Sequence, residues 1–216
     1  MTEAVRKKLE NIPANYADTH LRHGYQKLLT SYEQHELPAD LARCLGSIIR
    51  ASNALSLDQR ARLLYEALSR LLVYDTGASE GQRRFSYISC LREGKSVCMG
   101  ISELYTLLGT AFGLKVQTII GYAGDLEHDD GGLHAWNLVW LSDDDAPYHI
   151  DLTWDLDHQN AFKYYLKSDA FFEKTHTWLK NRYPSCPEDR EAEKIPKIPQ
   201  EAVDLVCRRL KQLRTK

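Results

Sequence analysis

Three residues in this chain have the types and the order that nucleophilic catalysis requires. Cys98 follows a Gly-containing loop and opens the apolar-periodic segment 97–112, which predicts a thiol in the first turn of a helix. Backbone N–H groups and the positive end of the helix dipole favour the thiolate there. His134 and Asp151 follow in apolar, aromatic surroundings. The sequence therefore predicts a nucleophile, a base and an orienting carboxylate.

The chemistry expected of this set is acyl transfer from an amide. Cys98 attacks the carbonyl, His134 keeps the thiol ionised and later protonates the leaving amine, and Asp151 fixes the tautomer of the imidazole. The backbone N–H of Cys98 is one expected oxyanion donor. No cofactor and no metal are expected. Further candidates for the oxyanion hole or the cleft are Gln82, Tyr74, Tyr87 and Trp136.

The secondary-structure elements that are expected to position these residues divide the chain into three parts. Residues 1–73 are predicted to form an N-terminal helical layer packed on the core, residues 74–186 the catalytic core, and residues 187–216 a linker and a C-terminal helix. Within the first part, helices are expected at 5–12, 21–32, from Pro38 through Ile49, and at 57–73 after an N-cap at Ser56. The last helix, with Leu205, Leu210 and Leu213 as its apolar stripe, is expected at the surface.

The core is predicted to place a helix at 97–112 before strands at 116–122, 133–141 and 148–154. Segment 162–166 is expected to add a strand, and Ser168 to cap a short helix. Helices followed by adjacent strands indicate an α+β fold. The short connection 142–147 predicts an antiparallel hairpin, in which a simple register places Asp151 opposite Leu138. Contact between Asp151 and His134 then requires a register offset or a bulge.

The overall composition argues against several classes of protein. The net charge of −2 and the pI of about 6.4 argue against a nucleic-acid partner. The five cysteines are odd in number and form no CxxC pair, which argues against a disulfide scaffold or a Cys-rich zinc site. No membrane partner is expected, because no apolar run approaches the length of a spanning helix. A cytoplasmic protein is predicted, with export open if a signal peptide was removed; the oligomeric state stays open.

Other polar residues that could bind metal or do chemistry are expected to have structural roles instead. The acidic loop at 125–130, together with His134, has the spacing of neither an EF-hand nor a helical zinc site, so a solvated loop is expected. His176 and Cys186 would need further ligands to hold a metal. His149 and His158 are expected to face solvent or to line the cleft. Gly100 either admits substrate or allows close helix packing.

Three segments carry a resemblance to a known family: Val97-Cys98-Met99-Gly100, His134-Ala135-Trp136-Asn137 and Tyr148-His149-Ile150-Asp151-Leu152-Thr153-Trp154-Asp155. Further matching segments are Tyr74-Asp75, Tyr165-Leu166-Lys167-Ser168-Asp169, His176-Thr177-Trp178 and Tyr183-Pro184-Ser185-Cys186. They closely resemble the transglutaminase-like superfamily of papain-like cysteine enzymes, in its bacterial form, over about residues 60–186. Ser96 and Ile101 depart from the family pattern of a glycine before Val-Cys and an aromatic after Cys-x-Gly. The resemblance implies a papain-like core, with the nucleophile helix packed on an antiparallel sheet, and a metal-independent Cys-His-Asp triad.

The resemblance leaves the reaction open, because the superfamily includes hydrolases, acyltransferases and inactive modules. A peptidase or amidase acting on a peptide or protein through a thioester at Cys98 is expected first, because water is always present as an acceptor. A protein-glutamine transglutaminase, which transfers the acyl group to a lysine amine, is the alternative. A non-catalytic binding module on the same fold and a metal-dependent hydrolase are the other classes considered.

Overall fold

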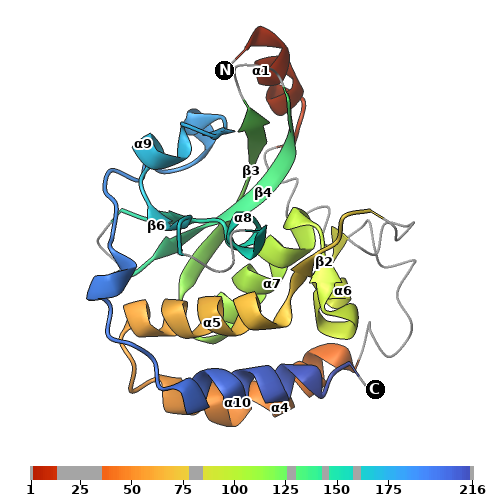
Figure 1. Cartoon of the computed structure of the whole chain (residues 1–216), viewed down its shortest axis with the longest axis vertical. Helices are drawn as coiled ribbons and strands as arrows, with labels where there is room; N and C mark the ends of the chain where they lie inside the picture. Colours follow the sequence, from red (N-terminus) through yellow and green to blue (C-terminus); the bar gives the residue numbers. More distant parts are fainter. Residues whose placement is uncertain are drawn as a thin grey trace.

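Two long strands, β3 (Lys115–Asp125) and β4 (Asp130–Trp140), run antiparallel through the centre of the structure, a computed structural model (Figure 1). The structure describes residues 2–13, 36–77, 85–125, 130–142, 146–157 and 162–214. The two strands pair from Lys115 opposite Trp140 to Asp125 opposite Asp130. Side chains two apart share a face, so each strand presents one set of residues to each side of the sheet.

Three shorter strands complete a five-stranded antiparallel sheet in the order β6-β5-β4-β3-β7. They are β5 (Tyr148–Ile150), β6 (Tyr165–Lys167) and β7 (His176–Thr177). A separate parallel pair, β1 (Val73–Tyr74) and β2 (Lys95–Ser96), lies just before the predicted nucleophile. The α+β fold class is confirmed.

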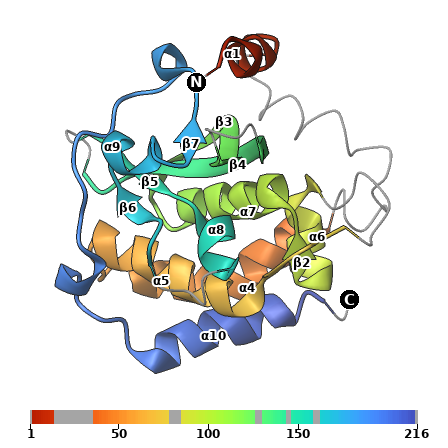
Figure 2. The ribbon, with the colours of Figure 1, turned by 45° about the horizontal axis from the view of Figure 1, so that its top comes forward.

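Helix α7 (Cys98–Ala111) lies across one face of this sheet (Figure 2). Polar groups fix it there: the Asn137 amide donates to the Ser102 carbonyl at 3.1 Å and to Thr106 Oγ1 at 2.9 Å. Thr106 is also 3.0 Å from the Thr118 hydroxyl of β3. A buried polar group is expensive without a partner, so these bonds select one position of the helix on the sheet.

Two helical layers follow on the far side of α7 (Figure 1). Helix α5 (Leu57–Leu71) packs on α7, and α4 (Leu37–Ser52) and α10 (Gln200–Lys211) lie side by side beyond it. All four contribute to one continuous apolar core. Fully buried side chains such as Leu64 and Leu68 each contribute roughly 1.5–3 kcal/mol. Ser56 begins α5 with a capping box, as its sequence predicts.

The opposite face of the sheet is covered by aromatic side chains and short elements. These elements are α9 (Asp169–Phe172) and the 3-10 turn η4 (Lys180–Arg182), whereas α8 (Leu152–Asp157) lies against α7 and α5. Ser168 caps α9, as predicted, by accepting the N–H of Phe171 at 3.3 Å. The chain then wraps from 184 to 199, with one 3-10 turn, η5 (Ala192–Lys194), before it reaches α10.

The predicted strand at 148–154 is wrong in its second half. Strand β5 ends at Ile150, and helix α8 begins at Leu152. Asp151 makes this change, because its Oδ1 accepts the N–H of Trp154 at 3.1 Å, three residues later, as an N-cap aspartate does. The strand prediction failed because isoleucine, threonine and tryptophan all have high strand propensity, and this propensity does not include the capping role of Asp151.

Other boundaries also differ from the expectation. Strand β6 covers Tyr165–Lys167 rather than 162–166. Phe162, with a φ of 53°, lies outside the strand, and Leu166, with a φ of 54°, lies at the irregularity in its pairing with β5. Helix α5 ends at Leu71, so Val73 belongs to β1. In α10 the buried stripe is Val203, Val206 and Leu210, and Leu205 is half-buried.

The N-terminal expectation is met in part. Helix α1 (Glu3–Glu10) buries Val5 and Leu9, as predicted. The helix expected at 21–32 and the side chain of His158 lie outside the described residues. Helix α6 (Tyr87–Glu93) was not predicted. Among the described helices, none is both long enough and apolar enough to span a membrane.

Candidate active site

Cys98 is the first residue of α7, and it is half-buried. The residue before it, Val97, is the N-cap and makes no side-chain hydrogen bond to the helix. By contrast, Thr2, Ser56, Ser86 and Ser168 each cap their own helices with a side-chain oxygen. The first N–H groups of an α-helix have no acceptor within the helix. At α7 no N-cap side chain competes for these N–H groups, which lie at the same end of the helix as the Cys98 thiol.

Gly100 allows the start of α7 to lie against the preceding loop. A Cβ at this position would meet Ser96 Oγ and would stand 2.6 Å from the Ser86 carbonyl oxygen. Contacts this close are not tolerated, and one of these neighbours is backbone. The structure therefore supports the packing role for Gly100, which sets the position of Cys98.

His134 and Asp151 meet through a register shift of two residues. Leu138 pairs with His149 and not, as the simple hairpin predicts, with Asp151. Continuing the same register places Asp151 beside Trp136, whose neighbour on the same face of β4 is His134. His134 Nε2 then lies 2.7 Å from Asp151 Oδ2. Both side chains are buried, and Asp151 is 0% exposed.

The other ring nitrogen of His134 serves the thiol. The Cys98 side chain is hydrogen bonded to the His134 ring and to the backbone N–H of Ala135. Because Asp151 engages Nε2, the nitrogen left for Cys98 is Nδ1. Burial raises the pKa of the Cys98 thiol, but the charge and hydrogen bond of His134 outweigh burial, so the net pKa is lowered. The pKa of His134 is raised, because Asp151 and Cys98 outweigh the opposing effect of burial.

Both shifts favour the pair of a thiolate and an imidazolium over the neutral pair. The pKa of Asp151 lies well below its usual range: burial opposes ionisation, but His134 and His176 hold the carboxylate ionised. Cys98, His134 and Asp151 are thus brought together as expected from the sequence. Their roles in catalysis stay predictions.

His176 is a residue that the sequence analysis did not assign to the site. Its Nε2 lies 3.1 Å from Asp151 Oδ2, the same oxygen that His134 contacts. Its sequence signal is that His176-Thr177-Trp178 belongs to the segments that resemble the family, but no spacing rule places it beside Asp151, because it comes from β7, at the far edge of the sheet from Asp151. Long-range packing alone places it here.

Trp136 supports the site from within the core. The ring is 1% exposed, and its centroid lies 5.9 Å from that of His134. A Cβ on Gly121 would meet this ring, so the glycine opposite His134 makes room for it. The indole N–H donates to His149 Nδ1 at 2.9 Å, and so it is already engaged.

His149 is buried, and the expectation that it faces solvent or lines the cleft is wrong. Its side chain is 0% exposed, and its Nε2 lies 2.8 Å from Asp169 Oδ1. The register shift explains the error, because His149 pairs with Leu138 and shares its inner face. Burial lowers the pKa of His149 despite Asp169. The ring is therefore a neutral link between Trp136 and α9.

The remaining candidates for the oxyanion hole are Gln82, Tyr74 and Tyr87. Gln82 lies outside the described residues. Tyr74 is in β1, paired with Ser96, two residues before Cys98. Tyr87 begins α6, and its backbone N–H donates to Glu103 at 3.0 Å. The role of these side chains as oxyanion donors stays a prediction.

Two groups of side chains in the described parts of the chain bring metal-ligand atoms together. One is His134, Asp151 and His176, and the other is His149, Asp169 and Cys186. The second group suits a metal poorly. The Trp136 N–H occupies His149 Nδ1, which leaves the ring proton on Nε2, and burial raises the pKa of Cys186 so that it stays a thiol. Of the predicted acidic loop, residues 126–129 lie outside the described structure.

A buried apolar cluster packs against Cys98, and Leu133 is exposed on the same face of the sheet. Ala135 and Ile120 pack with Cys98 and Met99, and Ile12 packs on the same cluster. Further along this face Leu133 is 52% exposed. Tyr122, opposite Leu133, is covered by Val5 and Leu9 of α1. Helix α1 therefore stands beyond the start of α7, with Leu133 open beside it.

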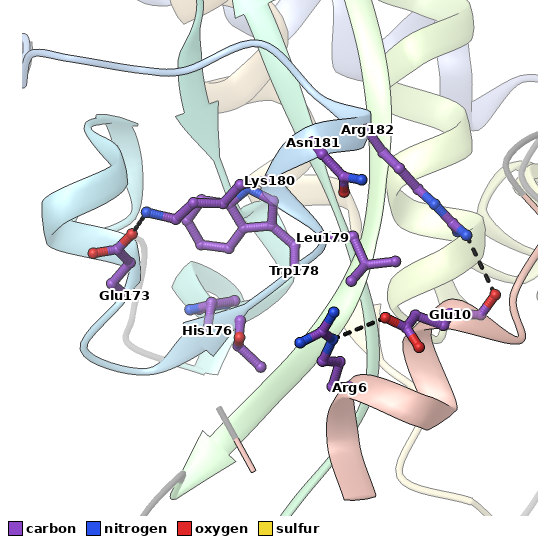
Figure 3. Close-up of a pocket in the computed structure, with 10 residues that line it drawn as sticks. Arg6, Glu10, Glu173, His176, Trp178, Leu179, Lys180, Asn181 and Arg182 are labelled. Carbon is purple, nitrogen blue, oxygen red and sulfur yellow. Dashed lines mark hydrogen bonds and ion pairs between the residues drawn. The ribbon is translucent and has the colours of Figure 1, made fainter. Parts of the chain in front are cut away.

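A cavity of about 630 Å³ lies between α1 and the segment that contains β7 and η4 (Figure 3). Its charged side chains are engaged: Arg6 pairs with Glu10 at 2.8 Å, and Lys180 pairs with Glu173. Arg182 donates to the Ile12 carbonyl at 2.6 Å. His176 contributes to its lining, whereas Cys98 does not.

Comparison with known families agrees with this geometry. The sequence model of the transglutaminase-like superfamily matches residues 42–152, more than half of the 216-residue chain. The chain therefore belongs to the transglutaminase-like superfamily, and the resemblance found in its three motifs is confirmed. The matched region contains Cys98, His134 and Asp151. His176 lies beyond it.

A search of curated proteins gave no match. Among solved structures, the chain is similar to one described as a proposed cysteine protease, from Cytophaga hutchinsonii. The TM-score is 0.35 and the identity 15%, over 71% of this chain and 43% of that chain. The chain thus spans less than half the length of the solved protein. The fold assignment rests on the family match and on the sheet, not on this likeness.

Proposed function

We propose that this protein is a cysteine-dependent amide acyl-transfer enzyme that forms a thioester at Cys98 and hydrolyses it. One observation carries the proposal: His134 is hydrogen bonded to the thiol of Cys98, while its other nitrogen is 2.7 Å from the buried carboxylate of Asp151. This arrangement supplies an ionised nucleophile, a proton carrier and a group that fixes the ring.

The reaction begins when the Cys98 thiolate attacks the amide carbonyl carbon and forms a C–S bond. The carbonyl electron pair moves to oxygen, and this oxyanion faces the N–H of Cys98 at the start of α7. The His134 imidazolium gives its Nδ1 proton to the amide nitrogen, so the C–N bond breaks and an amine leaves. A thioester and a neutral imidazole remain.

Hydrolysis reverses these roles. Neutral His134 takes a proton from water, and the oxygen adds to the thioester carbonyl. The C–S bond then breaks, which releases a carboxylic acid and restores the thiolate beside the imidazolium. Asp151 keeps its negative charge throughout and stabilises the charged form of the ring. No group outside this set is required for proton balance.

A peptide or protein is the proposed substrate class. The surface next to Cys98 supports this choice, because Leu133 is exposed beside Ala135 and Ile120 on one face of the sheet. An apolar side chain of an extended peptide would be removed from water on this surface. Acyl transfer to an amine uses the same thioester, and it is the second outcome of the test below.

The test offers a glutamine-containing peptide with and without a primary amine. Peptide cleavage or ammonia release that exceeds amine incorporation supports the hydrolase, and faster amine incorporation assigns a transglutaminase. Cys98→Ala must abolish either product, while Cys44→Ala, at another half-buried thiol, must not. If neither product forms and Cys98 reacts with iodoacetamide no faster than Cys207, the protein is a binding module on this fold.

A further inference from the structure

The carboxylate of Asp151 serves two histidines at one oxygen. His134 Nε2 is 2.7 Å from Oδ2, and His176 Nε2 is 3.1 Å from the same atom. The other oxygen, Oδ1, accepts the N–H of Trp154 at 3.1 Å. Both Asp151 and His176 are 0% exposed. The direction of the carboxylate is thus set by a backbone group on one side and by His176 on the other.

His176 has the tautomer that this role needs. Its Nδ1 lies 2.9 Å from the Thr175 hydroxyl, which can donate to it. The proton of the neutral ring is then on Nε2, directed at Asp151. Burial lowers the pKa of His176, although Asp151 opposes this effect. A neutral donor leaves the full negative charge of Asp151 in place to stabilise the imidazolium of His134.

The charged groups around His176 are consistent with a neutral ring. On the inner side it faces Asp151, while His134 and His149 disfavour a positive charge on it. On the outer side the cavity lining holds two ion pairs, Arg6 with Glu10 and Lys180 with Glu173, and also Arg182, which donates to the Ile12 carbonyl and likewise disfavours a positive charge on the ring (Figure 3). Each pair is close to neutral overall. Asp151 therefore remains the dominant partner of the ring.

Aromatic packing holds the ring in place. The centroids of Trp154, Phe172 and Trp136 lie 4.5, 4.7 and 5.1 Å from the centroid of His176. The backbone of His176 pairs with Ala123 of β3. A side chain locked by packing and by hydrogen bonds loses little entropy when it orients a neighbour, and this makes it an effective support for a catalytic group.

We propose that His176 is a positioning residue for catalysis: its Nε2–H holds Asp151 in the orientation that fixes the ring of His134. This inference rests on the proposed function, which gives Asp151 and His134 their roles. It adds a fourth member to the site, from a strand outside the region that the family match covers.

The test compares His176→Phe with His176→Gln. Phenylalanine keeps a flat ring in the aromatic packing but removes the donor, whereas the glutamine amide can place an N–H near the position of Nε2. We expect His176→Phe to lower kcat on the order of 10- to 100-fold with little change in KM, because a misplaced catalytic group costs rate rather than binding. His176→Gln is expected to recover most of kcat.

The pH dependence of iodoacetamide alkylation at Cys98 separates positioning from packing. In His176→Phe the weakened contact between Asp151 and His134 should raise the pKa of Cys98. The acid limb, which is the pH range over which the alkylation rate falls on acidification, should then move to higher pH. His149→Gln is the matched control, because His149 is a buried histidine in the same aromatic cluster that bonds Asp169 instead. It is expected to leave the limb in place.

Four results would overturn the proposal. One is an unchanged kcat and alkylation limb in a folded His176→Phe, and another is an equal loss in His176→Gln. If His176→Phe does not fold, Thr175→Val takes its place, since it frees Nδ1 and should shift the limb in the same direction by a smaller amount. The absence of any shift in Thr175→Val would then overturn the proposal.

The ¹⁵N spectrum of His176 in the unmodified protein must also show the neutral Nε2–H tautomer. That readout needs no turnover, so it separates a failure here from a failure of the proposed function.

Discussion

The hydroxyl of Tyr65 in α5 donates a hydrogen bond to the buried carboxylate of Asp155, four residues after Asp151. Asp155 also accepts the N–H groups of Lys163 and Tyr164, at 3.1 Å each. The backbone N–H of Asp151 in turn donates to the Tyr164 carbonyl at 2.9 Å. The helical layer is thereby connected to the segment that carries the proposed catalytic aspartate.

Tyr65→Phe should therefore lower both stability and activity. The variant loses a buried hydrogen bond to a carboxylate, so we expect a decrease of about 1.5–3 kcal/mol in the free energy of unfolding, measured by denaturant titration. Turnover should fall because α5 then loses its hydrogen bond to α8, the helix that follows Asp151 directly. Tyr105→Phe is the control: its buried hydroxyl donates to the Ala61 carbonyl at 3.2 Å, away from this segment. A similar loss of turnover in both variants would contradict the connection.

Cys98 should react with iodoacetamide at about pH 6, well before the other thiols. An ordinary thiol is only about 0.3% ionised there, because its pKa is near 8.5. The pKa of Cys98 is lowered by His134, so its thiolate persists as pH falls, down to its own lowered pKa. Burial raises the pKa of Cys90, to about 12, and it also raises that of Cys207. Peptide mapping by mass spectrometry after short exposure measures the order of reaction.

Asp151→Asn should shift this reaction to higher pH. The amide cannot stabilise the imidazolium, so the pKa of His134 falls and that of Cys98 rises. Alkylation at about pH 6 should decrease by at least 10-fold, and turnover should decrease more, since the ring loses its fixed tautomer. An unaltered alkylation rate would show that Asp151 does not act through His134.

Glu103 makes stability depend on pH. The side chain is 2% exposed, and burial raises its pKa to about 8 despite a hydrogen bond from the N–H of Tyr87. Between the unfolded pKa of about 4.3 and this value, the folded state holds a proton that the unfolded chain has released. Stability should therefore fall as pH rises through this window, by up to about 1.4 kcal/mol per pH unit.

Glu103→Gln removes that dependence and keeps an acceptor for Tyr87. The variant should match the parent protein below about pH 4 and exceed it in stability at pH 8 by a few kcal/mol. Urea titrations across this pH range measure the difference. Parallel stability curves for the two proteins would show that Glu103 does not hold a proton in the folded state.

Gly100→Ala should displace the start of α7. The added Cβ meets Ser96 Oγ and stands 2.6 Å from the Ser86 carbonyl, so we expect a loss of about 1–3 kcal/mol and a marked decrease in turnover. Gly46→Ala is the matched control in α4, where the nearest atom is Arg50 Nη1 at 3.5 Å. There alanine should stabilise the helix by roughly 0.5–1 kcal/mol. Equal effects at both sites would contradict the packing role of Gly100.

Leu133→Ser should raise KM for a peptide substrate more than it lowers kcat. Leu133 is 52% exposed on the sheet face in front of Cys98, and serine removes apolar surface that the substrate would cover. Leu107→Ser provides the comparison, because Leu107 is also an exposed apolar residue, at 39%, but lies within α7 beyond the nucleophile. If both variants give the same kinetics, the substrate does not use the surface around Leu133.

Much of the architecture follows from local sequence. The period of Leu41, Leu45 and Ile48 predicts α4, and the Ser56 cap predicts the start of α5. Cys98 and Gly113 mark the limits of α7, because one follows the N-cap and the other adopts a φ of 77° after its end. These signals are read from residues within one or two helical turns, so they need no tertiary contact.

The site itself is less local. The sequence identifies Cys98, His134 and Asp151 by their surroundings and by the family that the motifs resemble. It does not show that β5 pairs with β4 two residues out of simple register, which is what brings Asp151 to His134. It also misplaces His149, because a strand's buried face is set by that same register.

The sequence by itself determined the residues of the candidate site and the family: a thiol at a helix start, an imidazole and a carboxylate, within the transglutaminase-like superfamily. Only the tertiary structure decided which oxygen of Asp151 meets His134, that His176 shares it, and that Trp136 is engaged with His149. The physical reason is that side-chain identity and local propensity act along the chain. Register, burial and shared hydrogen bonds depend on residues far apart in it, such as His134 and His176 on non-adjacent strands of the sheet.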